Sequence, residues 1–158
     1  MMDQIVTDEA ILRTISKETT LSEIRSLKLV NRLKKANKTA WTKGAGLAAI
    51  QIGIPLRFAW FIANGKEETL LNPEIILAKG ERIYKNEGCL SIPDSYVDTV
   101  RFNYIEYISG GKKMSAMNFK AILIQHEIDH MDGILNVDRE YTNKALDKQE
   151  EIKKQINS

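Results

Sequence analysis

The spacing of apolar residues near the start of the chain predicts an amphipathic helix. From residue 21 to about residue 38 the sequence is rich in helix formers, and Leu29, Leu33 and Ala36 form an apolar stripe along it. The basic side chains of this segment fall largely on its other faces. We therefore expect a helix that packs its stripe on the core and leaves a basic face in solvent.

The middle of the chain carries patterns that are typical of strands. Residues 56–62 form a short β-prone run, and the Asn64-Gly65 pair after it is a hairpin-type turn signal. Residues 96–108 alternate as a half-buried strand does and end at a pair of glycines. One parity of this strand is occupied by Val100, Phe102, Tyr104 and Ile108.

A second helix is predicted from about residue 115 to residue 132, with Ser115 as its cap and Gly133 as its stop. Its apolar residues fall on two opposite faces, so we expect it to be buried on both sides. One face carries Phe119, Ile122, Leu123, His126 and His130, the other carries Ala121, Ile124, Ile128 and Met131, and a narrow polar wedge carries Gln125, Asp129 and Asp132. With a last helix over about residues 142–155, the chain is predicted to be α+β, with mixed or antiparallel sheets packed around the buried helix and one helix towards each terminus.

Composition and charge limit the class of protein further. A chain of 158 residues with 43% hydrophobic residues can bury one core, so we expect a single domain over residues 1–158. Its 23 basic and 21 acidic residues nearly balance, which gives no strong field for DNA or for anionic lipid. No segment approaches the roughly 20 apolar residues of a membrane span. The N-terminus also lacks a signal-peptide pattern, so we expect a cytoplasmic protein.

The candidate chemistry lies in the central helix, in the HExxH sequence His126-Glu127-Ile128-Asp129-His130. The chain has 2 histidines in all, and at a spacing of four residues both rings can reach one metal ion. Glu127 is close enough to act as a proton shuttle without being a ligand. The motif can arise by chance on a helix, but two buried imidazoles without partners are costly, and a metal ion satisfies both.

A catalytic metal site of this kind has three protein ligands and one open position. Downstream the sequence offers Glu140, Glu150 and Glu151 as a third ligand. Upstream, Cys89 stands between a glycine and a Ser-Ile-Pro turn that would hold a thiolate rigidly. Two histidines with one cysteine suit iron(II), zinc, nickel or cobalt better than magnesium or calcium.

A glycine-bracketed segment at residues 43–53, KGAGLAAIQIG, is the last candidate. Its GxG lacks both the dinucleotide-binding spacing and a strand-then-helix context, so we do not interpret it as a phosphate loop. We expect a tight backbone that passes close to a ligand, with the Gln51 amide projecting from it. The alternative is simple loop packing.

These three segments resemble the signatures of the peptide deformylases, GxGLAAxQ, EGCLS and QHExDH. They stand in order at residues 44–51, 87–91 and 125–130, and the similarity spans roughly residues 5–139. The stretch from Arg101 to Gln125 is shorter than the family pattern, so the chain resembles a compact or divergent member. The resemblance implies an enzyme that removes the N-formyl group from the starting methionine of newly made proteins and releases formate.

The resemblance also implies a role for each site residue. The metal, Fe²⁺ in the family with Zn²⁺, Ni²⁺ or Co²⁺ as substitutes, would have the ligands Cys89, His126 and His130. Glu127 would be the general acid and base, and the Gln51 side chain with the Leu90 N–H would stabilise the oxyanion. Gly46 and Ile128 would contribute to the methionine pocket.

The surrounding residues have less specific expectations. Glu87 would pair with Arg101 to brace the Cys89 loop, and Asp129 would either orient a ligand imidazole or lie in solvent. Tyr96 stands near a position where some bacterial members have an arginine that grips the peptide backbone.

Two alternatives stand beside an active deformylase. One is an inactive relative that keeps the metal, which the intact Gln51, Cys89 and Glu127 disfavour. The other is an HExxH zinc peptidase, which Cys89 as the third ligand disfavours. For a deformylase, the expected partners are N-formylmethionyl nascent peptides and, transiently, the ribosome. We expect the protein to be a monomer.

Overall fold

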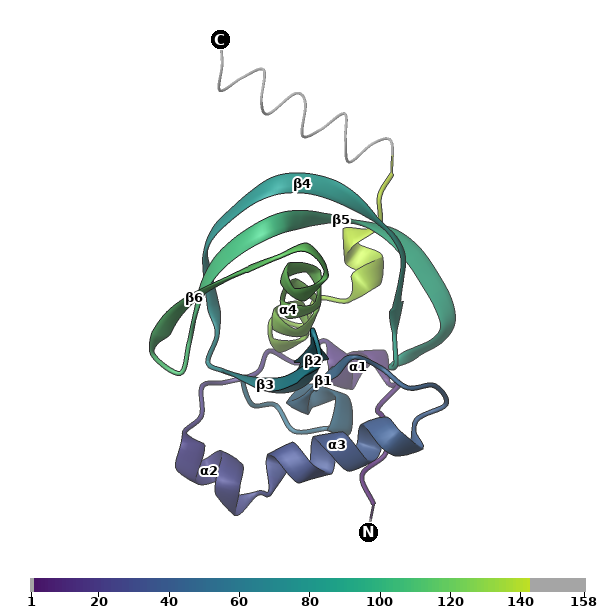
Figure 1. Ribbon diagram of the computed structural model, residues 1–158. Coiled ribbons are helices and arrows are strands. Elements are labelled where there is room, and N and C mark those ends of the chain that lie inside the picture. Colours follow the sequence, from purple (N-terminus) through teal and green to yellow (C-terminus); the bar gives the residue numbers. More distant parts are fainter. Residues whose placement is uncertain (1, 143–158) are drawn as a thin grey trace.

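The computed structural model describes residues 2–142 and shows two antiparallel sheets around a central helix (Figure 1). The first sheet has the order β1-β2-β3, with bounds Gly46–Ala48, Phe58–Ala63 and Lys66–Leu71. The second has the order β4-β5-β6, with bounds Glu74–Cys89, Ile92–Ser109 and Lys112–Met117. The α4 helix, Asn118–Met131, lies between them. The predicted α+β class is confirmed.

The turn between β2 and β3 follows the sequence prediction. Asn64 and Gly65 both have positive φ, 53° and 75°, and Ala63 pairs directly with Lys66. Two left-handed residues match the twist of the flanking strands, which is why this dipeptide favours tight hairpins. The strand predicted at residues 56–62 is shifted slightly, to Phe58–Ala63.

The N-terminal segment forms three short helices, α1 at Glu9–Leu12, α2 at Leu21–Ser26 and α3 at Leu29–Thr39. The single helix predicted over residues 21–38 is therefore wrong, because Lys28 adopts a left-handed conformation with φ 53° and separates α2 from α3. In one continuous helix, residues 24 and 29 would lie about 140° apart. The break allows Ile24 and Leu29 to join one apolar cluster beneath the first sheet.

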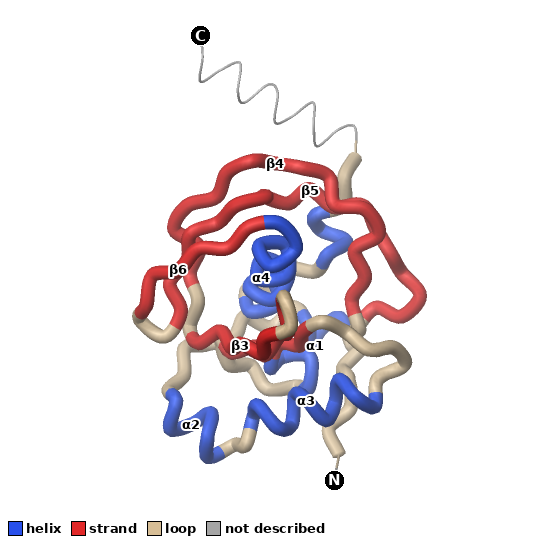
Figure 2. The backbone as a smooth tube through the Cα atoms, in the orientation of Figure 1, coloured by secondary structure: helices blue, strands red, loops and turns tan. Residues whose placement is uncertain are grey.

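The α4 helix runs between the strands of the two sheets (Figure 2), and most of its residues from Ala121 onwards are buried. It begins at Asn118, three residues later than predicted, because Ser115 pairs within β6 instead of capping the helix. The predicted stop is confirmed at Gly133, which has φ 72°. Burial on both sides is confirmed as well, but the polar wedge is wrong, since Gln125 and Asp129 are only 6% and 7% exposed.

The strands β4 and β5 are long and curve over α4 (Figures 1 and 2). The half-buried alternation predicted within β5 is confirmed. Val100, Phe102, Tyr104 and Ile108 are partly buried, whereas the opposite face carries the buried residues Thr99, Arg101, Ile105, Tyr107 and Ser109. Both faces of the strand carry polar as well as apolar residues. The buried face is the one on which Arg101 pairs with the carboxylates of Glu87 and Asp129.

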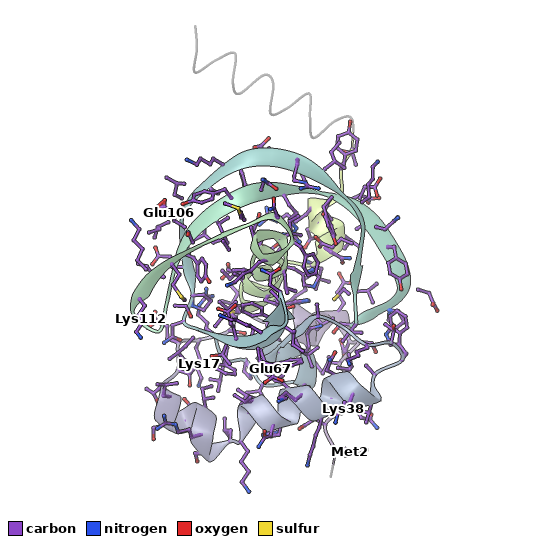
Figure 3. The ribbon with its side chains drawn as sticks, viewed as in Figure 1. Met2, Lys17, Lys38, Glu67, Glu106 and Lys112 are labelled. Carbon is purple, nitrogen blue, oxygen red and sulfur yellow. The ribbon has the colours of Figure 1, made fainter. Side chains whose placement is uncertain are left out.

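Figure 3 shows side chains filling the space between α4 and the sheets, with Lys38 and Lys112 at the periphery. None of the described helices is long and apolar enough to cross a membrane. The helix predicted over residues 142–155 lies outside the described residues, apart from its first position.

Candidate metal centre

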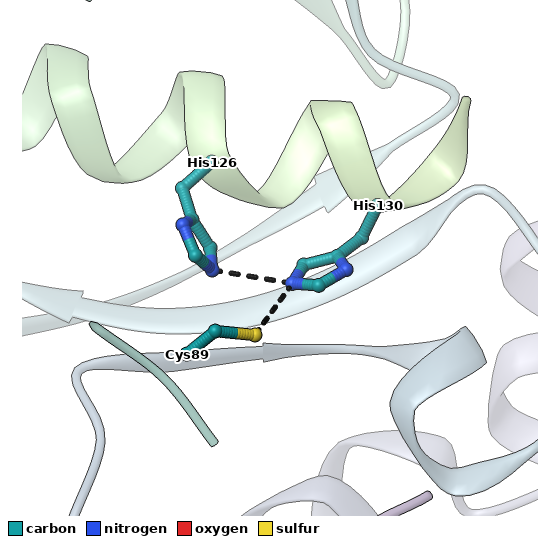
Figure 4. Close-up of side chains that lie close together, drawn as sticks. All are labelled: Cys89, His126 and His130. Atoms are coloured by element: carbon teal, nitrogen blue, oxygen red, sulfur yellow. Dashed lines mark hydrogen bonds between the residues drawn. The ribbon is translucent and has the colours of Figure 1, made fainter. Parts of the chain in front are cut away.

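Three side chains from distant parts of the sequence meet beside α4 (Figure 4). Cys89 ends β4, whereas His126 and His130 lie one turn apart on α4. The Sγ of Cys89 lies 3.4 Å from Nε2 of His130, and the two histidine Nε2 atoms are 3.2 Å apart. All three donor atoms fall within 4.8 Å of one another. The structure thus brings together the three residues that the sequence proposes as ligands.

The donor set fits a divalent transition metal. A tetrahedral ion bound at about 2.0–2.3 Å from nitrogen and sulfur would set its ligands roughly 3.3–3.6 Å apart. The observed sulfur–nitrogen separation of 3.4 Å falls within that range, and the nitrogen–nitrogen separation of 3.2 Å lies just below it. Imidazole and thiolate ligands favour zinc, iron, nickel or cobalt over calcium and magnesium.

Glu127 lies next to this cluster with no structural partner for one of its oxygens. The side chain is 1% exposed, and its Oε2 has no hydrogen bond within residues 2–142. Burial raises the pKa of Glu127 to about 7. A carboxyl group with a pKa near neutrality can both accept and donate a proton.

The pKa values of the two imidazoles are shifted in opposite directions. Burial lowers the pKa of His130 well below its ordinary value, and the positive charge of His126 acts in the same direction. Burial also disfavours charge on His126, but its contacts with Cys89 and Glu87 outweigh this effect and raise its pKa. A neutral His130 presents a lone pair to a cation without first losing a proton.

Gly46 lies where β1 passes closest to the site. A Cβ atom on this residue would lie 2.9 Å from Cβ of Phe61, 3.0 Å from the Trp60 carbonyl oxygen and 3.2 Å from Oε1 of Glu127. Any side chain here would therefore displace the strand or the carboxylate. This agrees with the close backbone approach expected from the glycine-bracketed segment.

A carboxylate contacts one of the two imidazoles, but it is not the carboxylate that was predicted to do so. Oε2 of Glu87 lies 3.0 Å from Nδ1 of His126, whereas Asp129 pairs with Arg101 at 2.6 Å and with Arg139 at 3.1 Å. The prediction that Asp129 orients an imidazole or lies in solvent is therefore wrong. A partner on Nδ1 leaves the Nε2 atom of His126 directed at the cluster.

Glu87 also forms the predicted pair with Arg101, at 2.7 and 2.9 Å, and this prediction is confirmed. Burial by itself would raise the pKa of Glu87, but hydrogen bonds from His126 and Arg101 outweigh it and lower the pKa to about 2. Thr99 donates a further hydrogen bond at 3.0 Å. Glu87 is therefore a fixed negative charge behind the cluster.

Gln51 lies close to Cys89. Its Nε2 lies 3.8 Å from Sγ of Cys89 and donates to Oγ of Ser91 at 3.1 Å, while its Oε1 accepts from the Ala48 N–H at 3.0 Å. Leu90, which follows Cys89, is buried, and its carbonyl accepts from the Trp41 indole at 3.0 Å. Ser91 belongs to the EGCLS signature, but sequence reasoning missed its contact with Gln51 and the role of Trp41, because both contacts are made between loops that are distant in the sequence.

A cavity of about 270 Å³ opens onto the cluster. Its lining includes Cys89, His126, Glu127, Gln51, Leu90 and Gly46. Ile128 does not line it and instead packs in the main core. The apolar wall of the cavity comes from Ile122 and Leu123, which precede His126 by one turn.

A Cys-His-His cluster with an adjacent buried carboxylate, held by a helix inside an α+β fold, defines a metal-dependent hydrolase. Comparison with known proteins identifies the family. The family model described as polypeptide deformylase matches residues 2–147. A peptide deformylase of Helicobacter pylori (strain P12) is 41% identical over 145 residues, which cover 82% of this chain and 80% of the relative.

Solved structures agree with this assignment. The peptide deformylase of Thermotoga maritima superimposes with a TM-score of 0.79 at 29% identity, covering 90% of this chain and 99% of that one. A Synechococcus elongatus peptide deformylase in complex with actinonin gives a TM-score of 0.78 at 29% identity, covering 93% and 82%. The chain belongs to the peptide deformylase family. It is a hydrolase of protein biosynthesis that removes the N-formyl group from nascent peptides.

Proposed function

We propose that Cys89, His126 and His130 hold one divalent metal ion and that Glu127 moves the protons of the deformylation reaction. The mutual distances of the donor atoms support this ligand set. One thiolate and two imidazoles suit Fe²⁺, Zn²⁺, Ni²⁺ and Co²⁺ alike. Following the family resemblance, Fe²⁺ is the proposed native ion and the other three are substitutes. When bound, such an ion supplies Lewis-acid chemistry, lowering the pKa of water and polarising a carbonyl oxygen.

Glu127 would take a proton from the attacking water and deliver one to the departing amine as the formyl C–N bond breaks. The products are formate and a free N-terminal amine. The buried position of Glu127 and its unpartnered oxygen support this role, because neither is required for a structural contact.

Negative charge that develops on the formyl oxygen would be stabilised by the Gln51 amide and by the Leu90 N–H. The position of the Gln51 Nε2 atom, 3.8 Å from the Cys89 sulfur, supports this assignment for the side chain. A donor placed in this way is typically worth about 3–4 kcal/mol in the transition state.

The methionine side chain would enter the cavity along Gly46, Ile122 and Leu123. Ile128 supports this wall from the core, since it packs in the same cluster as Leu123. We further propose one domain over residues 1–158 that acts as a monomer in the cytoplasm and touches the ribosome transiently. The near-balance of basic and acidic residues supports recognition of the peptide through contacts in the cavity rather than through a strong electrostatic field.

The observation that carries the proposal is the unpartnered oxygen of Glu127 beside three convergent donor atoms. The test is formate release from formyl-Met-Ala-Ser by anaerobically purified, iron-loaded protein. Glu127→Gln should retain the metal and lose about 10²–10⁴-fold in kcat. Glu74→Gln, at an exposed position on β4, is the control and should leave kcat unchanged. Normal turnover by Glu127→Gln would contradict the proton-transfer role.

A further inference from the structure

Exposed aromatic side chains gather at the mouth of the active-site cavity. Trp41, Tyr96 and Phe119 are 46%, 55% and 47% exposed, and all three line it. Tyr84 lines it too, with its ring centroid 6.5 Å from that of Phe119. We call these four residues the aromatic rim. Large apolar groups that are left exposed together commonly mark a binding surface.

Two rings of the aromatic rim are fixed on either side of Cys89. The Trp41 indole N–H donates to the carbonyl of Leu90, the residue after the cysteine, at 3.0 Å. The ring of Tyr96 lies against Gly88, the residue before it, because a Cβ there would be 2.7 Å from Cε1 of Tyr96. These contacts hold both rings in place. The two side chains therefore lose little conformational entropy when a ligand stacks on them.

The size of the cavity determines what reaches the aromatic rim. At about 270 Å³ it lies just below the usual range of ligand pockets, roughly 300–1,000 Å³. Such a space encloses a formyl group and one side chain, so the following peptide residues must leave over the rim. Of the charged residues that line the cavity, Glu87 and Glu127 are buried and Lys43 is exposed. The exposed residues of the lining are Trp41, Tyr96 and Phe119 together with Thr42, Lys43 and Asn86, so aromatic rings supply the large apolar surface of the mouth.

We propose that the aromatic rim selects formylmethionyl peptides with an apolar or aromatic side chain at the second or third residue. This inference rests on the proposed function and adds a substrate preference to it. Trp41 is its main determinant, because the indole offers the largest ring and is anchored at the edge of the Cys89 turn. One aromatic contact of this kind changes affinity by roughly two- to tenfold.

The test compares kcat/KM of the iron-loaded enzyme for four peptides: formyl-Met-Ala-Ser, formyl-Met-Phe-Ser, formyl-Met-Ala-Phe and formyl-Met-Asp-Ser. At least one phenylalanine peptide should exceed formyl-Met-Ala-Ser by roughly three- to tenfold. Trp41→Ala should bring this ratio towards one. Trp41→Phe should keep most of it, because it retains a ring although it loses the indole N–H. Ile15→Ala, an exposed apolar position that does not line the cavity, is the control.

Three results would overturn the proposal. The first is equal kcat/KM for the phenylalanine and alanine peptides. The second is a preference for the aspartate peptide that disappears in Lys43→Gln. The third is an equal loss of the ratio in Trp41→Phe and Trp41→Ala, which would assign the effect to the Leu90 hydrogen bond instead of the ring. Inactivity towards all four peptides would contradict the proposed function itself, whereas activity without discrimination would contradict only the selectivity.

Discussion

Replacing Arg101 by methionine would leave two buried carboxylates without the cation that they share. The guanidinium is 2% exposed and donates to Glu87 at 2.7 and 2.9 Å and to Asp129 at 2.6 Å. Methionine fills a similar length without charge, so the change removes the electrostatic partner and keeps much of the packing. The lost interaction lies directly behind His126, which Glu87 contacts.

The structure limits the size of the effect. Breaking a buried ion pair typically costs about 3–5 kcal/mol, because the remaining charge stays buried. Here both carboxylates keep a second partner, His126 for Glu87 and Arg139 for Asp129, so we expect the lower end, about 3 kcal/mol. In a protein of this size each kcal/mol moves Tm by roughly 2–4 °C, which gives a decrease of about 6–12 °C.

Urea and thermal unfolding of the metal-free protein would measure the loss. Arg139→Met is the matched control, because it removes a partner of the same Asp129 from a side chain that is 45% exposed, and should cost at most about 1 kcal/mol. In the metal-bound protein, Arg101→Met should also weaken metal affinity about 10–100-fold, since Glu87 would hold the His126 ring less firmly.

Equal urea midpoints for Arg101→Met and Arg139→Met would refute this reasoning. A second comparison tests its cause. If the destabilisation comes from uncompensated charge, adding Glu87→Gln and Asp129→Asn to Arg101→Met should recover part of the lost stability. No recovery would assign the loss to packing instead.

Three further predictions concern the same site. Cys89→Ala should lose the metal, measured by elemental analysis after dialysis, whereas Cys89→Ser should keep a weakened site. Gln51→Ala should lower kcat by about 10²–10³-fold with the metal retained, and an unchanged kcat would exclude an oxyanion role. The pKa of Glu87 is about 2 against an ordinary value of 4.5, so its ionised form stabilises the fold fully above about pH 4.5, and this stabilisation is lost as the pH falls towards 2. Between about pH 4.5 and pH 2, the urea midpoint of metal-free Glu87→Gln should therefore fall less steeply with pH than that of the unmodified protein.

The sequence predicts the parts of the site that depend on local spacing. The two histidines share a helical face because they lie four residues apart, and α4 places them there. The turn at Asn64-Gly65 follows from two residues that tolerate positive φ. Cys89 could be offered as a third ligand from its own surroundings, beside Glu140, Glu150 and Glu151, but only the family resemblance selected it, because nothing in local spacing brings β4 to α4.

Long-range polar contacts account for what the sequence did not predict. Gln125 and Asp129 look like a solvated wedge because periodicity counts them as polar, yet each has a partner on β5. Alternation alone likewise does not tell which face of β5 is buried, because the buried face carries Arg101. The break at Lys28 was missed for a different reason, since lysine is a good helix former and carries no signal for a left-handed conformation.

Most of the α4 helix is buried, so the polar groups that it carries need partners within the fold, and all but two of its buried polar side-chain atoms have one. Gln125 bonds the Phe102 backbone at 3.0 and 2.8 Å, and Asp129 and His126 have charged partners. Within residues 2–142, buried side-chain atoms without a hydrogen bond on α4 occur at Glu127 and His130, both in the HExxH motif. An unsatisfied buried polar atom costs about 1–3 kcal/mol, and both of these atoms belong to residues for which we propose a role in proton transfer or metal binding. In the proposed mechanism the unpartnered oxygen of Glu127 receives the proton of the attacking water, whereas the neighbouring carboxylates of Glu87 and Asp129 are held by Arg101.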